Sequence, residues 1–145
     1  MKITKQQAAE ANLDAAIDAF LRGDWVPAIH MAGAAEEVFG RLQEAKGGST
    51  VPDYFWEKTD FKDIVEKKKD YISALNYFRD WIKHHRPDHP IEIEIQESHA
   101  VLSVMRACIA QATYTQKGRR SVASFLHWYS ENGERINGII EGWPE

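Results

Sequence analysis

Apolar side chains recur every three or four residues along most of this chain, which is the spacing of amphipathic helices. The first pattern follows Thr4, which forms a candidate capping box with Gln7, and it ends at Gly23. The second begins at Trp25 and ends before the loop at residues 47–52. Its apolar face is rich in alanine and glycine, so we expect a neighbouring helix to approach it closely.

A long third helix is predicted beyond this loop. Asp60 is its expected N-cap. Pro87 and Pro90 end the helix, because proline lacks an amide hydrogen and clashes with the preceding turn. A short helical turn at residues 53–58 is expected to precede it.

The last third of the chain predicts two more helices. Residues 91–95 alternate between isoleucine and glutamate like a strand, but no partner strand is evident, so we expect an extended connection. A fourth helix runs from about Gln96 to Tyr114, and Ser121 is the expected N-cap of a fifth. We therefore predict an all-α fold, an up-and-down bundle of about five helices in a single domain over residues 1–145.

The composition fits a globular protein with a real core. Of the 145 residues, 43% are hydrophobic, and the net charge of -4 leaves no basic field that could drive bulk binding of nucleic acid. The single cysteine, Cys108, excludes an internal disulfide and is expected to be an inert core thiol. Because the N-terminus lacks an apolar signal core and no run reaches transmembrane length, we expect a cytoplasmic protein that does not contact a membrane.

A polar stripe near the end of the third predicted helix is the candidate functional site. The stripe comprises Asn76, Arg79, Asp80, Lys83 and His84. Arg79 and His84 stand about 140° apart around an ideal helix, at opposite edges of the stripe. They would converge if the helix unwinds near Pro87, or if a second copy of the chain packs alongside.

These residue types suit the cleavage of RNA without a metal ion. A neutral His84 can accept the proton of a ribose 2′-OH, and Arg79 can hold the phosphate and stabilise the charge of the transition state. Asn76 and Lys83 would position the RNA backbone, and Asp80 would orient Arg79 or His84. The alternative is a solvated polar face, with His84 at a helix C-terminus where the helix dipole favours a cation.

Two other polar groups are candidate parts of a site. Glu36 and Glu37 follow the alanine-rich face of the second helix. If that helix is central, at least one of them should point towards protein, and Glu37 is a candidate supporting residue; the alternative places both at the solvent edge. The histidines and aspartate of residues 84–89 lie in one proline-flanked loop, which is a poor zinc site. We expect no metal and no cofactor.

The segment Arg79-Asp80-x-x-x-His84 resembles the motif of HEPN domains. In that family an arginine, a polar residue and then a histidine lie late in a long helix of a small α-bundle. Three other segments are also similar to this family. They are residues 13–21, residues 32–37, and the pairs Leu75-Asn76 and Lys83-His84. The resemblance covers roughly residues 5 to 137.

The resemblance implies a helical bundle that forms a homodimer, in which both Arg79 and His84 pairs line one cleft between the subunits. Many HEPN members are endoribonucleases of toxin–antitoxin, phage-defence or RNA-processing systems. The implied partners are an RNA substrate and an antitoxin or nucleotidyltransferase-type protein. Other members have lost catalysis and serve as interaction or nucleotide-binding modules. A third interpretation is a helical structural protein outside this family.

Overall fold

The computed structural model describes residues 1–141, except for the side chains of residues 61 and 138–141. Within that part of the chain it contains eight helices and no strand. They are α1 (Lys5–Leu21), α2 (Trp25–Ala45), α3 (Val51–Lys58), α4 (Phe61–Ile64), α5 (Lys68–Leu75), α6 (Tyr77–Lys83), α7 (Glu97–Thr115) and α8 (Arg120–Glu141). The all-α class is confirmed, whereas the predicted count of about five helices is wrong.

The start of α1 follows its sequence signal. Thr4 Oγ1 accepts a hydrogen bond from the Gln7 amide at 3.0 Å, and Gln7 Oε1 accepts one from the Thr4 amide at 2.9 Å. This is the predicted capping box, and it satisfies two amides that the first helical turn leaves without a partner. The predicted turn before the third helix is also present, as α3, and Thr50 caps it.

The start of α8 differs from the prediction. The helix begins at Arg120, so Ser121 lies within its first turn instead of capping it. The Ser121 hydroxyl donates to Asp14 Oδ1 of α1 at 2.6 Å. A contact with a residue more than 100 positions away has therefore taken the hydroxyl that sequence reasoning assigned to a local cap.

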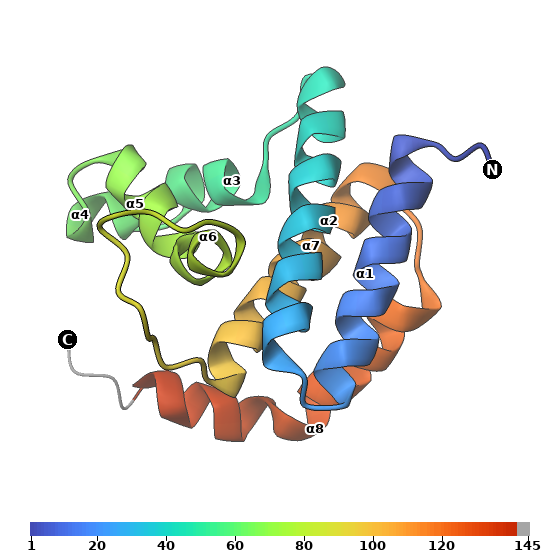
Figure 1. Ribbon diagram of the computed structural model, residues 1–145. Helices are drawn as coiled ribbons and strands as arrows, with labels where there is room; N and C mark the ends of the chain where they lie inside the picture. Colours follow the sequence, from blue (N-terminus) through green and yellow to red (C-terminus); the bar gives the residue numbers. More distant parts are fainter. Residues whose placement is uncertain (142–145) are drawn as a thin grey trace.

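The core lies where α2 packs along both α1 and α7, and α8 crosses below this group (Figure 1). Three alanines of α2, Ala28, Ala32 and Ala35, have no exposed surface. Small side chains let helix axes approach closely, and this confirms the expectation drawn from the alanine-rich face. Among residues 1–141, no helix combines the length and the apolar content needed to cross a membrane.

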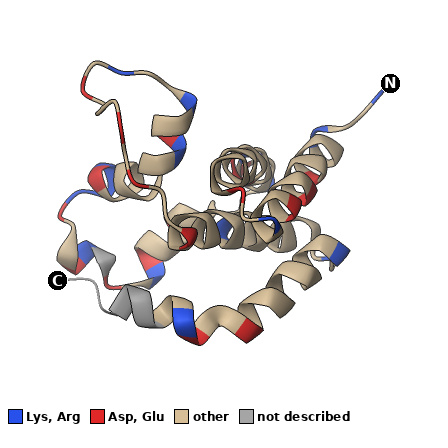
Figure 2. Ribbon diagram, turned by 60° about the horizontal axis from the view of Figure 1, so that its bottom comes forward, with Lys and Arg blue, Asp and Glu red and all other residues tan. Residues whose placement is uncertain are grey.

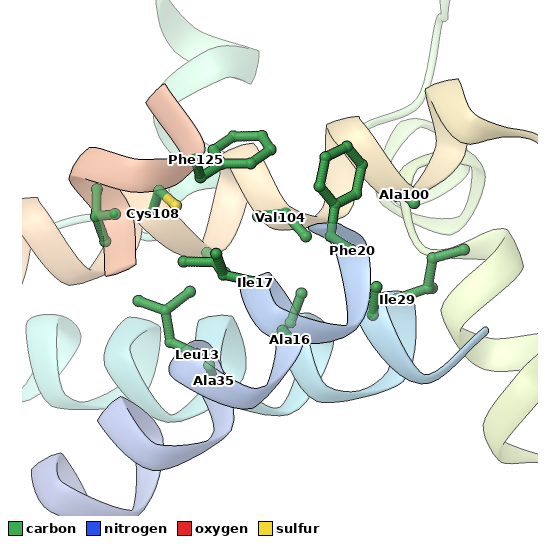
Figure 3. Packing of buried hydrophobic residues seen from close by; sticks show 14 of the residues in the cluster. Leu13, Ala16, Ile17, Phe20, Ile29, Ala35, Ala100, Val104, Cys108 and Phe125 are labelled. Carbon is green, nitrogen blue, oxygen red and sulfur yellow. The ribbon is translucent and has the colours of Figure 1, made fainter. Parts of the chain in front are cut away.

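Aromatic rings attach α8 to this core. The Phe20 ring of α1 lies 5.3 Å from the ring of Phe125 and 4.6 Å from that of Trp128, both in edge-to-face geometry. Figure 3 shows the rings of Phe20 and Phe125 near Val104 of α7. Edge-to-face pairs add about 0.5–1.5 kcal/mol each beyond their buried area, so these contacts fix α8 as well as covering the core.

The single cysteine is part of the same core. Cys108 on α7 is 3% exposed, and burial raises the pKa of its thiol to about 12. A thiol held protonated is a weak nucleophile, as expected for an inert core residue.

The long third helix is the main error of the sequence prediction. Residues 61–83 form three short helices, α4, α5 and α6, and not one long helix. They lie together on the left in Figure 1, away from α1. The second break falls at Asn76. The Asn76 side chain and the carbonyl of the preceding Leu75 both accept hydrogen bonds from Arg106, which is distant in sequence. A tertiary hydrogen bond therefore competes here with the continuation of the helix.

Sparse burial also explains why this segment does not form one helix. Of the described side chains in residues 51–83, only those of Val51 and Tyr71 are buried. In proteins, most helical stability comes from packing of an apolar face, so short helices with little burial gain little from being continuous.

Candidate binding pocket at the junction of α2, α6 and α7

A buried ion pair joins α2 to α7. Arg106 is 4% exposed and Glu36 is 6% exposed. Glu36 Oε1 accepts hydrogen bonds from Arg106 Nη2 at 2.8 Å and from Nε at 3.2 Å. The prediction that one of the two adjacent glutamates points towards protein is thus confirmed for Glu36, and Glu37 is exposed.

The same guanidinium holds the break between α5 and α6. Arg106 Nη1 donates to the Leu75 carbonyl at 2.9 Å, and Nη2 donates to Asn76 Oδ1 at 2.9 Å. Each nitrogen of the buried guanidinium therefore has an acceptor. Removing one partner of such a pair would leave a buried charge uncompensated, which is strongly destabilising.

Arg79 lies next to this pair because α2 has a glycine at the point of contact. A Cβ placed on Gly33 would lie 2.2 Å from Arg79 Cδ and 2.7 Å from Cγ. The Arg79 stem therefore runs directly across the backbone of α2. Its nearest carboxylate among the described residues is Asp80, at 3.8 Å between Nε and Oδ1, and the Arg79 side chain keeps 21% of its surface exposed.

A polar pocket of about 240 Å³ opens beside Arg79. Three of the residues proposed from sequence, Asn76, Arg79 and Glu37, line it together. Its charged lining residues are Glu36, Glu37, Arg41, Glu44, Asp53, Arg79 and Arg106. Figure 2 shows that acidic and basic positions are likewise spread over several helices and not confined to one.

Ion pairs neutralise most of these charges. The pairs are Arg106–Glu36 at 2.8 Å, Arg41–Glu44 at 3.0 Å and Lys68–Asp53 at 2.9 Å. The hydrogen bond from Lys68 also lowers the pKa of Asp53, so this carboxylate stays charged at neutral pH. Among the described residues, Arg79 pairs with Asp80 alone, at 3.8 Å, which is beyond hydrogen-bond distance. Glu37 forms no ion pair in that part of the chain, although its charge helps to raise the pKa of Arg41.

The other residues of the predicted stripe lie elsewhere. His84 and Lys83 are exposed, and neither lines a described pocket with Arg79. His84 is the C-cap of α6 and has extended backbone angles. Asp80 is half-buried and contacts Arg79 at the distance given above. Arg79 and His84 therefore face different environments within one chain.

A second, mostly apolar pocket of about 340 Å³ lies against the same residues. It shares Glu36, Arg79 and Arg106 with the polar pocket, so these three side chains form the wall between the two. The Phe78 and His99 rings that line it stack with their centroids 3.7 Å apart. Burial lowers the pKa of His99, so its ring is neutral at pH 7.

The histidine-rich loop does not come together as a metal site. Within residues 1–141, no group of three histidine, cysteine, aspartate or glutamate side chains is arranged to hold a metal ion. Trp81, at the same end of α6, donates from Nε1 to the Pro90 carbonyl at 2.7 Å and so ties this loop back to the helix.

Sequence reasoning did not identify Arg106 as part of the site. The available signal was a single arginine within an otherwise apolar run of α7, matched by the acidic Glu36 at the end of the alanine-rich face of α2. A charge on an apolar helix face is almost always paired, so the two could have been proposed as partners.

The fold and the pocket define an all-α protein in which a buried ion pair forms part of a small polar site lined by α2, α3, α5, α6 and α7. The chain matches no family model, and no curated protein or solved structure is significantly similar to it.

Proposed function

We propose that this protein is a HEPN-like helical binding module that holds a phosphate-bearing ligand at Arg79. The observation that carries the proposal is the state of Arg79 in the polar pocket. Its stem is fixed across Gly33, and among the described residues its guanidinium forms one ion pair, with Asp80 at 3.8 Å, and no hydrogen bond. An arginine with free donors in a fixed position is well suited to bind phosphate.

The neighbouring groups indicate which ligand would fit. Asn76 Oδ1 already accepts from Arg106, so the amide NH₂ of Asn76 is the group left to donate to a phosphate oxygen. Glu37 is an acceptor only, and it suits a sugar hydroxyl. A nucleotide, or the end of an RNA strand, carries both groups. The pocket volume of about 240 Å³ admits the sugar–phosphate part of such a ligand, with the base outside.

The first test measures binding of adenosine monophosphate by isothermal titration calorimetry. Hydrogen bonds to a charged group contribute about 1.5–3 kcal/mol, so Arg79→Ala should weaken binding roughly tenfold or more. The control is Arg22→Ala, which removes an exposed arginine from the end of α1. Absence of binding, or equal affinity in the two variants, contradicts the proposal.

A dimeric endoribonuclease is the second candidate function. It rests on the family resemblance and on one observation: His84 is exposed at the C-cap of the short helix that carries Arg79, where a second copy of the chain can reach it. In that arrangement His84 of one subunit is the acid–base group and Arg79 holds the phosphate. Lys83 and Asp80 then support the pair, and an antitoxin or nucleotidyltransferase-type protein is the expected partner.

The nuclease candidate is tested with a labelled RNA and a measurement of molar mass in solution. A dimer whose cleavage is lost in His84→Ala, and kept in His127→Ala, supports it. His127 is a suitable control because it is an exposed histidine on α8. A monomer without cleavage contradicts the nuclease and leaves the binding module as the function.

A further inference from the structure

A third pocket of about 520 Å³ lies between α2, α3 and α7, on the far side of Thr50 and Val51 from the polar pocket. Gly40, Thr50 and Val51 line both pockets, so they form the ridge between them. The volume lies within the range of about 300–1,000 Å³ that is usual for small-molecule sites.

A glycine gives this pocket its shape. A Cβ on Gly40 of α2 would lie 3.3 Å from Thr50 Cγ2, so the start of α3 packs directly on the α2 backbone. Thr50 is itself fixed, because its hydroxyl oxygen accepts from the Asp53 amide as the cap of α3. The ridge is therefore held from both sides.

The chemistry of the pocket is the opposite of that of its neighbour. None of its lining residues carries a charge, whereas more than half of those around the polar pocket do. Ile109 and the half-exposed Tyr54 ring supply accessible apolar surface, and the fully buried Phe39 lies behind them. A charged ligand would lose its hydration here without gaining a counter-ion, and this is costly.

Three polar groups at the rim are unused within the chain. Among the described residues, the side-chain amide of Gln43 and the hydroxyls of Ser49 and Tyr54 make no hydrogen bond. An apolar pocket with a few convergent polar groups is the usual form of a ligand site, in which the polar groups fix the orientation of the ligand.

We propose that this pocket binds an uncharged, largely aromatic small molecule that carries a hydroxyl or carbonyl group. The ring lies against Ile109 and the Tyr54 ring, and its polar group bonds to Gln43, Ser49 or the Tyr54 hydroxyl. This site is separate from the Arg79 site and goes beyond the function proposed above. Its ligand differs in charge from a phosphate-bearing one.

The test compares two probes of the same shape, 2-naphthol and 2-naphthoate, by nuclear magnetic resonance titration of the labelled protein. Saturable shifts of the Gly40, Ser49 and Ala110 amides by 2-naphthol, with at least tenfold weaker binding of 2-naphthoate, support the proposal. Absence of saturable shifts at these amides, or equal affinity for the two probes, overturns it.

A matched pair of variants on α7 locates the probe. Thr113 is at the rim of the pocket, and the exposed Ala112 beside it is not part of the lining. Thr113→Trp should weaken 2-naphthol binding at least tenfold, and Ala112→Trp should leave it unchanged. Equal effects of the two changes overturn the proposal.

Two further variants separate this site from folding and from the Arg79 site. Ser49→Trp obstructs the pocket from the opposite wall, so it replaces Thr113→Trp if the latter fails to fold. Arg79→Ala should leave 2-naphthol binding intact while it weakens binding of adenosine monophosphate. Each of the two proposals can therefore fail independently of the other. A loss of 2-naphthol binding in Arg79→Ala counts against the proposal of a site for an uncharged ligand.

Discussion

Different forces hold two regions of the molecule in place. The first is the group of helices α1, α2, α7 and α8, and the second is the segment α3–α6. The first group buries nearly all of the core side chains, and α2 packs extensively against both α1 and α7. The segment α3–α6 buries few side chains, and its helices have eight residues or fewer. Its firmest polar attachment is Arg106, which bonds to Leu75 and Asn76 at the break between α5 and α6.

This difference places the candidate binding site at the boundary between the two regions. Core packing is strong but does not depend on direction, whereas hydrogen bonds fix positions and leave polar groups available. Arg79 and Asn76 belong to the weakly packed segment, and Glu37 belongs to the core helix α2. The pocket is therefore sensitive to whatever holds the segment against α2 and α7.

Loss of the anchor should have the largest effect. Arg106→Ala leaves Glu36 buried without a partner and removes the donor to Leu75 and Asn76. We expect a loss of about 3–5 kcal/mol in the free energy of unfolding, measured by urea denaturation. Hydrogen exchange should also accelerate in α5 and α6 more than in α1.

The control for the anchor is Arg135→Ala. Arg135 also pairs with a glutamate, Glu97, at 2.6 Å, but its side chain is 51% exposed. Surface pairs contribute about 0–1 kcal/mol, so this change should cost little. Equal costs for Arg106→Ala and Arg135→Ala would show that the buried pair is not the anchor.

A cavity in the core should lower the free energy of unfolding. Leu13→Ala removes a side chain with no exposed surface from α1 and should cost about 2–5 kcal/mol of unfolding free energy. Leu126→Ala, at a position that is 46% exposed on α8, should change stability by about 0.5 kcal/mol or less. Unlike Arg106→Ala, Leu13→Ala should not accelerate exchange selectively in α5 and α6.

One added methyl group at this boundary should weaken ligand binding while leaving the stability of the fold nearly unchanged. Gly33→Ala places a Cβ where Arg79 now lies, so the arginine must move. Moving Arg79 costs stability, but alanine favours a helix by up to about 1 kcal/mol over glycine. Because the two effects oppose each other, the free energy of unfolding should change little. Affinity for adenosine monophosphate should fall roughly tenfold. Gly118→Ala, which meets no atom within 4 Å, should leave the affinity unchanged.

The smallest expected effect is a pH dependence within the core group. The hydrogen bond from Arg119 lowers the pKa of Asp14, assisted by Ser121. A lowered pKa in the folded state stabilises the protein above the unfolded value of about 3.9, and this stabilisation disappears as the pH falls through the folded value.

Denaturation at two pH values tests this contribution. Asp14→Asn should lower the free energy of unfolding at pH 7 by about 1 kcal/mol or less, and the difference from the unchanged protein should shrink below about pH 4. Asp18→Asn alters an exposed carboxylate of the same helix and is the control. A difference that stays constant between pH 7 and pH 3 contradicts the assignment.

Local sequence signals predicted the elements whose periodicity and burial coincide. The helices α1, α2 and α7 follow their apolar patterns, and the capping box at Thr4 is present as expected. The third predicted helix failed because its apolar pattern was not matched by burial. The contact that breaks it at Asn76 comes from a residue 30 positions away.

The candidate site was predicted in part, for the same reason. Asn76, Arg79 and Glu37 were proposed from the sequence, and they line one pocket. His84 was proposed because it lies close to Arg79 in sequence, but the end of α6 leaves it exposed outside that pocket. Spacing along one helix gives the direction of each side chain only while the helix is regular.

The sequence by itself determined the all-α class, the main core helices and the presence of an arginine and an asparagine suited to phosphate. The tertiary structure alone decided which charges are buried. Glu36 and Arg106 lie 70 residues apart and meet only because two apolar helix faces pack together. Burial makes that pair obligatory and holds the α5–α6 break against α2 and α7, because a buried charge must be neutralised wherever the packing places it.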